Sequence, residues 1–214
     1  MATNGSLPAP NSCKSNPMNK PFSQACENNR RPILDILMPL LTTKTRVLEI
    51  GSGTGQHAVW FAQHMPHLIW QTSDLPKNHP AIRQWISDYP AANLLLPLEL
   101  DMLKNNWPSQ RYDAIFTANT AHIMPWEGVA NMFTKGGSQL QPKGLFCLYG
   151  PIGYGGTIVP QSNIEFDWYL RQQAAHQGIR QFEDINQLAI TAGLTLLDDY
   201  AMPANNRLLV WQKH

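Results

Sequence analysis

A glycine-rich loop between an apolar segment and a helical segment constrains the fold of this chain more than any other feature. The stretch VLEIGSGTGQHA runs from a strand-like segment directly into Gly51, Gly53 and Gly55, and a helical pattern follows at once. Glycines at such a turn let the backbone bend sharply and let a ligand approach the main chain closely. The free N–H groups and the helix N-terminus favour a negatively charged group. The loop therefore predicts an α/β fold with a nucleotide-type ligand.

The rest of the chain alternates segments of strand length with segments of helical period, which favours a mainly parallel sheet. The expected strands are 45–50, 67–74, 94–101, 112–119 and 144–151, and the expected helices between them are 55–65, 79–89 and 125–141. A proline in 94–101 suggests an irregular or edge strand. Gly136 and Gly137 are expected to end or kink the third of these helices.

Both ends of the predicted domain add further elements. The segment 22–41 looks helical in two pieces, with Pro32 opening the second piece at its first turn. Helices are expected around 164–177 and 182–193. The last two strands, 194–202 and 207–213, are joined by a tight connection and should form an antiparallel pair.

Composition limits the class of protein. A chain of 214 residues needs only one domain, and we expect a disordered tail over 1–19 and a single domain over 20–214. The net charge of +1 and the absence of a Lys/Arg-rich run give no support to a nucleic-acid partner. No apolar run is long enough for a membrane helix. Three dispersed cysteines argue against a disulfide framework, so a cytoplasmic protein is expected.

Acidic residues follow the second and third expected strands. Asp74 ends the second strand, where a carboxylate can accept hydrogen bonds from both hydroxyls of a ribose. Asp101 and Met102 end the third strand, where an acid and an apolar side chain can contact an adenine. Each acid alone is equally well explained as a helix cap. Together with the glycine loop, however, they fall at consecutive strand ends, where open α/β sheets bind ligands, and they predict a nucleoside cofactor.

The spacing of the glycines distinguishes between cofactors. The dinucleotide pattern requires Gly or Ala at the position of Gln56, and this counts against a nicotinamide-dependent oxidoreductase. The loop instead reads Glu49-x-Gly-x-Gly-x-Gly and looks like motif I of the class I S-adenosylmethionine-dependent methyltransferases.

From Lys20 to the C-terminus the chain resembles DUF938, a small methyltransferase-like family that is also labelled UPF0585 and includes the eukaryotic methyltransferase-like 26 proteins. The resemblance rests on ACENNRRPIL, VLEIGSGTGQHAVWFA, WQTSD, NTAHIMPWEG, LYGP, SNIEFDWYLR, GIRQFED and MPANNRLLVW. It implies a Rossmann-like class I methyltransferase fold: a mostly parallel seven-stranded sheet with a C-terminal antiparallel hairpin and helices on both faces. It also implies S-adenosylmethionine as cofactor and S-adenosylhomocysteine as product, but no particular substrate.

The cofactor site is predicted from the strand ends and the first helix. The expected cofactor-binding residues are Glu49, Gly51, Ser52, Gly53, Gly55, Gln56, Asp74, Leu75, Asp101, Met102, Asn119, Thr120, Asn29 and Arg30. On the first helix, Arg30 is placed to meet the methionine carboxylate. A solvated helix face explains Asn29 and Arg30 equally well.

The fourth strand ends in polar residues that suggest chemistry. Asn119 and His122 are the candidate catalytic residues, with His122 as a general base because its unperturbed pKa lies near neutrality. A turn residue at 119 and a helix cap at 122 are the plain alternatives. The candidate substrate-binding residues are Glu27, His122, Tyr154, Asn163, Asp167 and Arg171. For Asp167 and Arg171, four residues apart, a surface ion pair is the alternative.

The sequence therefore predicts a methyltransferase that acts on a small molecule, with an exposed protein side chain as the alternative acceptor. No catalytic metal is expected, because His57, His64 and His67 lack the spacing of a zinc site. Two alternatives remain: a non-catalytic S-adenosylmethionine-binding or scaffold protein, and the oxidoreductase. The sequence leaves the oligomeric state open.

Overall fold

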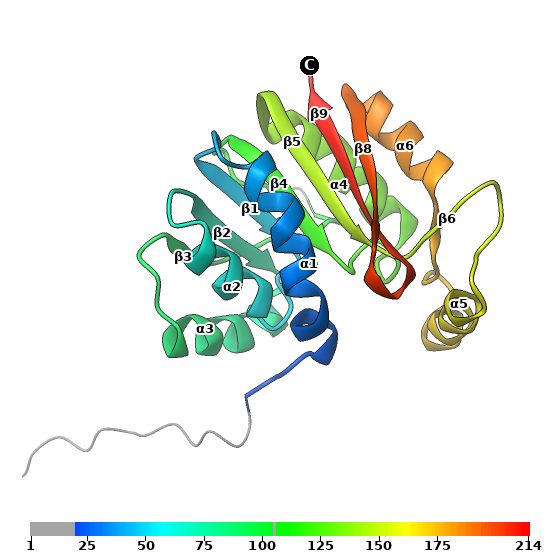
Figure 1. Cartoon of the computed structure of the whole chain (residues 1–214), viewed down its shortest axis with the longest axis horizontal. Helices are drawn as coiled ribbons and strands as arrows, with labels where there is room; N and C mark the ends of the chain where they lie inside the picture. The colour runs from blue at the N-terminus through cyan, green and yellow to red at the C-terminus, as the bar shows by residue number, and fades with distance from the viewer. Residues whose placement is uncertain (1–19, 105) are drawn as a thin grey trace, which may run out of the picture.

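The computed structural model describes residues 20–104 and 106–214. The tail expected over 1–19 lies outside the described residues. The described chain forms a twisted central sheet with helices on both faces (Figure 1).

Seven strands form the main sheet in the order β3-β2-β1-β4-β5-β9-β8. They are β1 (Arg46–Ile50), β2 (Ile69–Asp74), β3 (Leu94–Glu99), β4 (Tyr112–Ala118), β5 (Leu140–Gly150), β8 (Leu194–Met202) and β9 (Asn206–Lys213). Neighbours among β1 to β5 pair in parallel, whereas β9 pairs antiparallel with both β5 and β8. The parallel sheet with a C-terminal antiparallel pair is as predicted, and β3 does occupy an edge.

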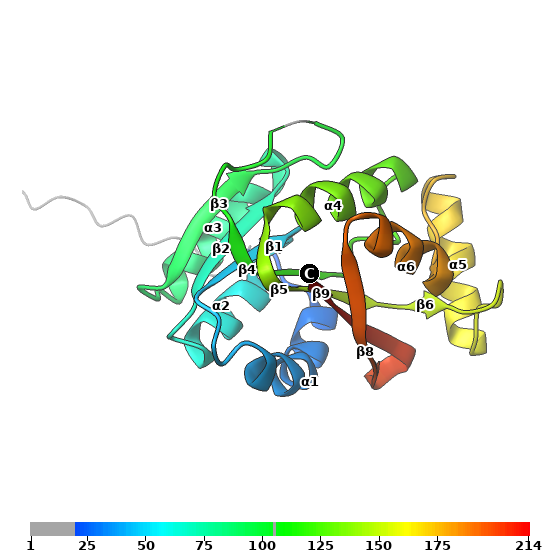
Figure 2. The same cartoon turned by 90° about the horizontal axis from the view of Figure 1, so that it is seen from above.

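The helices, apart from the one over Gln161–Gln173, divide between the two faces of the sheet (Figure 2). They are α1 (Gln24–Leu40), α2 (Gln56–His64), α3 (His79–Asp88), α4 (Trp126–Gln139), α5 (Gln161–Gln173) and α6 (Phe182–Thr191). Side chains of α1, α2 and α3 form one apolar cluster with the sheet, and side chains of α4 and α6 form the other. Because strand side chains alternate in direction, Phe116 joins the first cluster and its neighbour Ile115 joins the second.

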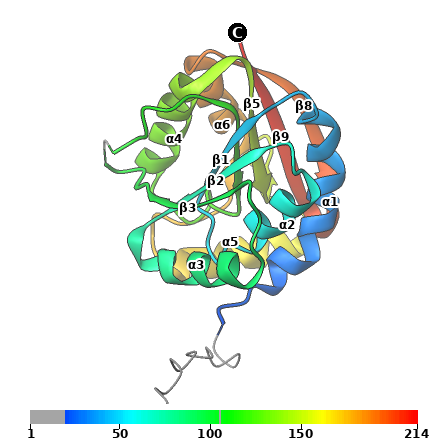
Figure 3. The same ribbon diagram turned by 90° about the vertical axis from the view of Figure 1, so that its left-hand side faces the viewer.

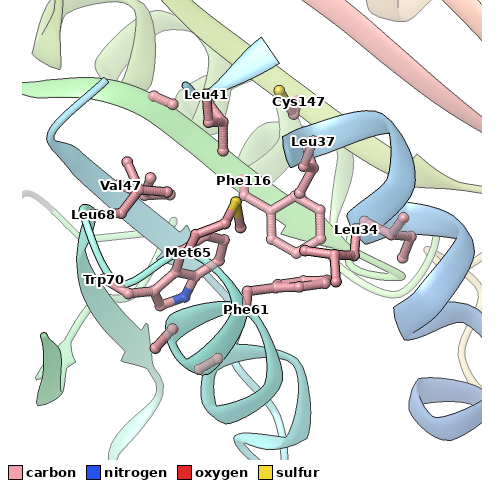
Figure 4. Packing of buried hydrophobic residues seen from close by; sticks show 14 of the residues in the cluster. Leu34, Leu37, Leu41, Val47, Phe61, Met65, Leu68, Trp70, Phe116 and Cys147 are labelled. Carbon is pink, nitrogen blue, oxygen red and sulfur yellow. The ribbon is translucent and has the colours of Figure 1, made fainter. Parts of the chain in front are cut away.

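The first cluster fixes the helix that follows the glycine loop. Phe116 of β4 lies between α1 and α2, with Leu34 and Leu37 on one side and Phe61 on the other (Figure 4). The rings of Phe61 and Phe116 meet edge to face with centroids 5.4 Å apart. Burial of several large side chains, each contributing about 1.5–3 kcal/mol, therefore anchors α2 against the sheet.

One helix prediction was wrong. The first helix, α1, is continuous from Gln24 to Leu40 and includes Pro32, rather than consisting of two pieces. Ile33, Leu34 and Leu37 after the proline are buried in the first cluster, and Asn29 before it is buried against His57. These contacts compensate for the lost hydrogen bond.

Helix α4 continues past Gly136 and Gly137 and ends at Gln139, so it does end near these glycines as predicted. A Cβ on Gly136 would lie 2.9 Å from Phe146, and a Cβ on Gly137 would lie 2.9 Å from Ala192. These glycines therefore serve close packing, and β5 begins immediately after the helix, earlier than expected.

Two further features position the site. A small parallel sheet of β6 (Ile152–Gly153) and β7 (Arg180–Gln181), which was not predicted, brackets α5. Helix α5 lies at the end of the sheet where the parallel strands finish (Figure 3).

None of the helices in the described ranges has the length and apolar character needed to cross a bilayer.

Candidate functional site

A cleft of about 1240 Å³ lies across the carboxyl ends of the five parallel strands. The loops that follow β1 to β5 contribute Gly51, Asp74, Asp101, Asn119 and Pro151 to its wall. Pockets for one drug-sized ligand usually have volumes of about 300–1,000 Å³. The cleft is therefore large enough for two small molecules side by side.

The glycines of the first loop have different roles. Gly51 and Gly55 have φ angles of 72° and 90°, and a Cβ on either would approach a neighbour closely: 2.5 Å from Thr120 Cγ2 for Gly51 and 3.1 Å from Ile82 Cα for Gly55. Gly53, with a φ of 59°, has no atom within 4 Å of the position of a Cβ. Gly51 and Gly55 are thus required for packing, and Gly53 leaves its backbone open to the cleft.

Asp74 holds the loop against the end of β2. Its Oδ2 accepts a hydrogen bond of 2.7 Å from the Gly53 N–H, and its Oδ1 accepts bonds of 2.7 Å from the Leu75 N–H and 2.8 Å from Asn78 Nδ2. Asp74 is 7% exposed and lines the cleft. A carboxylate offers about four lone-pair sites, so Asp74 can still accept one hydrogen bond from a ligand hydroxyl.

Glu49 supports the loop from beneath and does not line the cleft. Its carboxylate accepts hydrogen bonds of 2.9 Å from Ser52 Oγ and 3.1 Å from Trp70 Nε1. The pKa of Glu49 is raised to about 7, chiefly by burial and to a smaller extent by the neighbouring negative charge of Asp74. Gln56 has a similar supporting place, because its side chain bonds both the N–H and the carbonyl of Ser23 at the start of α1.

The loop after β3 forms an apolar wall with one acid. Asp101 Oδ1 accepts a hydrogen bond of 3.0 Å from the Leu103 N–H. Met102 and Leu103 line the cleft beside it, as does Leu75 from the loop after β2. A flat apolar ring with a polar edge fits between such side chains.

The end of β4 has a strained backbone. Asn119 has a φ of 57° in the left-handed region, which non-glycine residues rarely adopt. Thr120 Oγ1 is hydrogen-bonded to Thr117 Oγ1 at 2.6 Å, and Thr117 donates to the Ile50 carbonyl at 2.9 Å. These bonds tie the turn to the glycine loop. Strain of this kind is concentrated at functional sites.

His122 is buried in the same turn, is 6% exposed and lines the cleft. Burial lowers its pKa to about 4, and the positive charge of Arg180 contributes to the lowering. Its ring meets the ring of Phe166 from α5 at 5.4 Å and 75°. The imidazole is therefore neutral at pH 7 and has a nitrogen lone pair available to accept a proton.

Arg180 fixes the turn that carries His122, and sequence reasoning missed it. Its guanidinium donates hydrogen bonds of 2.9 Å to the Ala121 carbonyl, 2.7 Å to the Met124 carbonyl and 2.8 Å to the His176 carbonyl. All three acceptors are backbone atoms, which carry no residue signature. No pattern in the sequence therefore pointed to this role.

Several predicted site residues lie outside the cleft wall. On α1, Asn29 is buried with its Oδ1 2.6 Å from His57 Nε2, and Arg30 pairs with Glu27 while its guanidinium stacks on Trp60. His57, which was considered only as a metal ligand, does line the cleft.

Of the predicted substrate-binding residues, some line the cleft and others do not. Asn163 lines the cleft. Tyr154, by contrast, donates a hydrogen bond of 2.7 Å to Asp199, and Asp167 forms a 2.7 Å ion pair with Arg171 while accepting a 2.7 Å bond from the Ile179 N–H. Across residues 20–104 and 106–214 there is no cluster of three or more metal-ligating side chains.

The sheet order and the cleft define a class of protein. This is the Rossmann-like fold of class I methyltransferases, whose antiparallel last strands distinguish it from the all-parallel dinucleotide-binding sheet. The chain belongs to the family described as a protein of unknown function (DUF938), whose model matches residues 20–213.

Solved structures with the same fold include several methyltransferases. An O-methyltransferase family protein from Burkholderia thailandensis has a TM-score of 0.77 and 17% identity over 86% of this chain and 55% of its own. A putative O-methyltransferase from Nostoc punctiforme has a TM-score of 0.76 and 15% identity over 89% and 58%. Human N-acetylserotonin methyltransferase in complex with S-adenosylmethionine has a TM-score of 0.67 and 14% identity over 88% and 58%. The present chain spans little more than half of each.

Proposed function

We propose that this protein transfers a methyl group from S-adenosylmethionine to a small-molecule acceptor. The observation that carries the proposal is the cleft itself: an open glycine loop, Asp74 and Asp101 line it at the ends of three adjacent strands. Such an arrangement offers a nucleoside a close approach to the main chain and two carboxylates, and the volume leaves space for a second molecule.

The residues present fit S-adenosylmethionine. Gly53 would let the cofactor approach the main chain, Asp74 would accept a hydrogen bond from one ribose hydroxyl, and Asp101 with Met102 would contact the adenine. Asn119 and Thr120 would face the methionine part. When bound, the cofactor supplies an electrophilic methyl group on a positively charged sulfur.

The chain's own contribution is position and proton transfer. The apolar wall formed by Leu75, Met102 and Leu103 would suit a transfer in which the bound cofactor gives up positive charge. Holding an acceptor in line with the methyl group accounts for most of the rate enhancement. His122, neutral at pH 7, accepts the proton that a hydroxyl or amine releases.

Among the described cysteines, Cys26 and Cys147 are free, which favours a reducing compartment such as the cytoplasm.

Thermal unfolding with added ligands tests the proposal. At a concentration about 100 times its Kd, a ligand stabilises the folded state by about 2.7 kcal/mol. For a chain of 214 residues this corresponds to a rise in Tm of about 5–10 °C. We expect this rise with S-adenosylmethionine and S-adenosylhomocysteine and none with NAD or NADP. A rise with the dinucleotides alone would establish the oxidoreductase instead.

Asp74→Asn is expected to weaken S-adenosylhomocysteine binding by about 10- to 100-fold, since hydrogen bonds to a charged group contribute about 1.5–3 kcal/mol. The amide also turns an N–H toward either the Gly53 or the Leu75 donor. Calorimetric titration gives the affinities. The matched control is Asp88→Asn, on the exposed end of α3, which should leave the affinity unchanged. Equal affinity in wild-type protein and Asp74→Asn would contradict the assigned role of Asp74.

A further inference from the structure

The cleft has two chemically different halves. The first lies over β3, β2 and β1 and contains the glycine loop, Asp74 and Asp101. The second, which we call the acceptor half, lies over β4 and β5 and is covered by α5. Its wall includes His122, Ile123, Met124, Asn163, Phe166 and His176.

Two deeply buried polar side chains in the acceptor half have unused hydrogen-bonding atoms. Asn163 is 6% exposed, and its Nδ2 donates to the carbonyls of Val159 and Asn205, both at 3.2 Å. Within the described residues, no donor is hydrogen-bonded to Asn163 Oδ1 or to a ring nitrogen of His122, which is also 6% exposed. Neither atom is among the fully enclosed, unpartnered polar atoms of the described residues, so both are open to the cleft, where a ligand with hydrogen-bonding groups can pair with them.

The acceptor half also exposes apolar surface to the cleft. Ile123 and Phe166 are 45% and 37% exposed although both line its wall. The ring of Phe166 stands edge to face with the ring of His122. A planar ring can lie against such a pair, because aromatic rings favour stacked and edge-to-face contacts at these separations.

Fixed charge is absent from the lining of the acceptor half. The charged residues on the cleft wall are Asp74, Lys77 and Asp101, which all follow β2 or β3. In the described chain, the loops after β4 and β5, α5 and the turn between β8 and β9 place no Asp, Glu, Lys or Arg on that wall. A carboxylate, phosphate or ammonium group would lose its hydration there without gaining a partner of opposite charge.

We propose that the methyl acceptor is an uncharged aromatic compound that carries ring hydroxyl groups, with its ring against Phe166 and its hydroxyls toward His122 and Asn163. This inference rests on the proposed methyltransferase function. In the reaction, the acceptor oxygen forms a bond to the methyl carbon. The bond from that carbon to sulfur breaks and leaves its electron pair on sulfur, and the hydroxyl proton passes to a nitrogen of His122 and then to water.

The chemistry of His122 agrees with this choice of acceptor. Burial lowers the pKa of the imidazole to about 4, so it is a weak base. A ring hydroxyl, with a pKa near 10 as in tyrosine, releases its proton far more readily than an aliphatic alcohol. Methyl transfer further acidifies the oxygen as its bond to carbon forms. A weak base is therefore sufficient for a ring hydroxyl and poorly matched to an alkyl alcohol.

Calorimetry on the full-length protein saturated with S-adenosylhomocysteine tests the proposal. The probes are catechol, 2,3-naphthalenediol and 2,7-naphthalenediol, with 2,7-dimethoxynaphthalene and 2,6-naphthalenedicarboxylate as comparison compounds. We expect at least one diol to bind at least tenfold more tightly than both comparison compounds. With S-adenosylmethionine in place of the product, the bound diol should gain one methyl group, detected by mass spectrometry.

Two variants on one helix localise the binding. Phe166→Ala should weaken diol binding at least tenfold, whereas Trp168→Ala, an exposed aromatic that does not line the cleft, should change it less than twofold. Equal or tighter binding of the dicarboxylate, equal effects of both variants, or no diol binding to the loaded protein would overturn the inference. Failure of S-adenosylhomocysteine itself to bind would instead count against the proposed function, so the two failures are distinguishable.

Discussion

Gly51→Ala is expected to abolish measurable binding of S-adenosylhomocysteine and to lower the free energy of unfolding by about 2–5 kcal/mol. The new Cβ would lie 2.5 Å from Thr120 Cγ2, and the residue would have to keep a φ of 72°. Overpacking costs about 1–3 kcal/mol, and the left-handed conformation about 1–2 kcal/mol. The loop shifts to relieve this clash and moves away from the position in which Gly53 and Asp74 face the cleft.

The double variant Gly51→Ala/Thr120→Ser separates the two causes. Serine removes the clashing methyl group but keeps the hydroxyl that bonds Thr117 at 2.6 Å. The double variant should recover about 1–3 kcal/mol of stability and a measurable affinity, whereas Thr120→Ser alone should have little effect. Urea unfolding and calorimetry give both quantities. If the double variant were no more stable than Gly51→Ala, contact with Thr120 would not be the reason for glycine at this position.

Acidification from pH 6.5 towards pH 4 is expected to destabilise the protein steeply. Burial lowers the pKa values of His57 and His122 to about 4, whereas an unfolded histidine titrates near 6.5. The unfolded chain therefore binds up to two more protons in this window, and the stability from these groups falls as the pH falls. Glu49 acts in the opposite direction, because its raised pKa of about 7 means that the folded state holds one extra proton between pH 4.5 and 7.

The net difference is about one proton (two from the histidines minus one from Glu49), or a slope of about 1.4 kcal/mol per pH unit near pH 5.5. Glu49→Gln removes the opposing proton and should double this slope. His122→Phe removes one histidine and should bring it close to zero. Urea unfolding at intervals of half a pH unit measures the slopes. Identical slopes in all three proteins would show that these buried groups do not control the acid transition.

Much of the fold was predictable because its determinants are local. Strand-length apolar segments, the glycine loop and the tight turn before β9 each specify short-range structure, and the order of the sheet follows from the class that they define. The acids at Asp74 and Asp101 were predictable because parallel strands place their carboxyl ends on one edge.

Sequence reasoning failed where tertiary packing determines the local structure. Pro32 lies inside a continuous helix because the apolar residues after it are buried and Asn29 before it is held by His57. Gly136 and Gly137 do lie near the end of α4, but their close contacts with Phe146 and Ala192 were not predicted. These contacts depend on residues distant in the chain, which helical periodicity does not report.

The candidate site was predictable in part for the same reason. Residues that follow strands, such as Asn119, His122 and Asp74, do line the cleft. Residues chosen for their polar character on helices need not, because Asn29 pairs with His57 and Asp167 with Arg171. Polar residues lie at several positions around a helix, and only the assembled structure determines which of them border the cleft.

Calorimetric titration of the wild-type protein with S-adenosylhomocysteine tests the central claim most directly. We predict one site per chain with a Kd in the micromolar range, which corresponds to about −8 kcal/mol, and loss of that site in Gly51→Ala. A folded wild-type protein that binds neither S-adenosylhomocysteine nor S-adenosylmethionine at millimolar concentration would contradict the account and favour a scaffold that retains the fold without its cofactor.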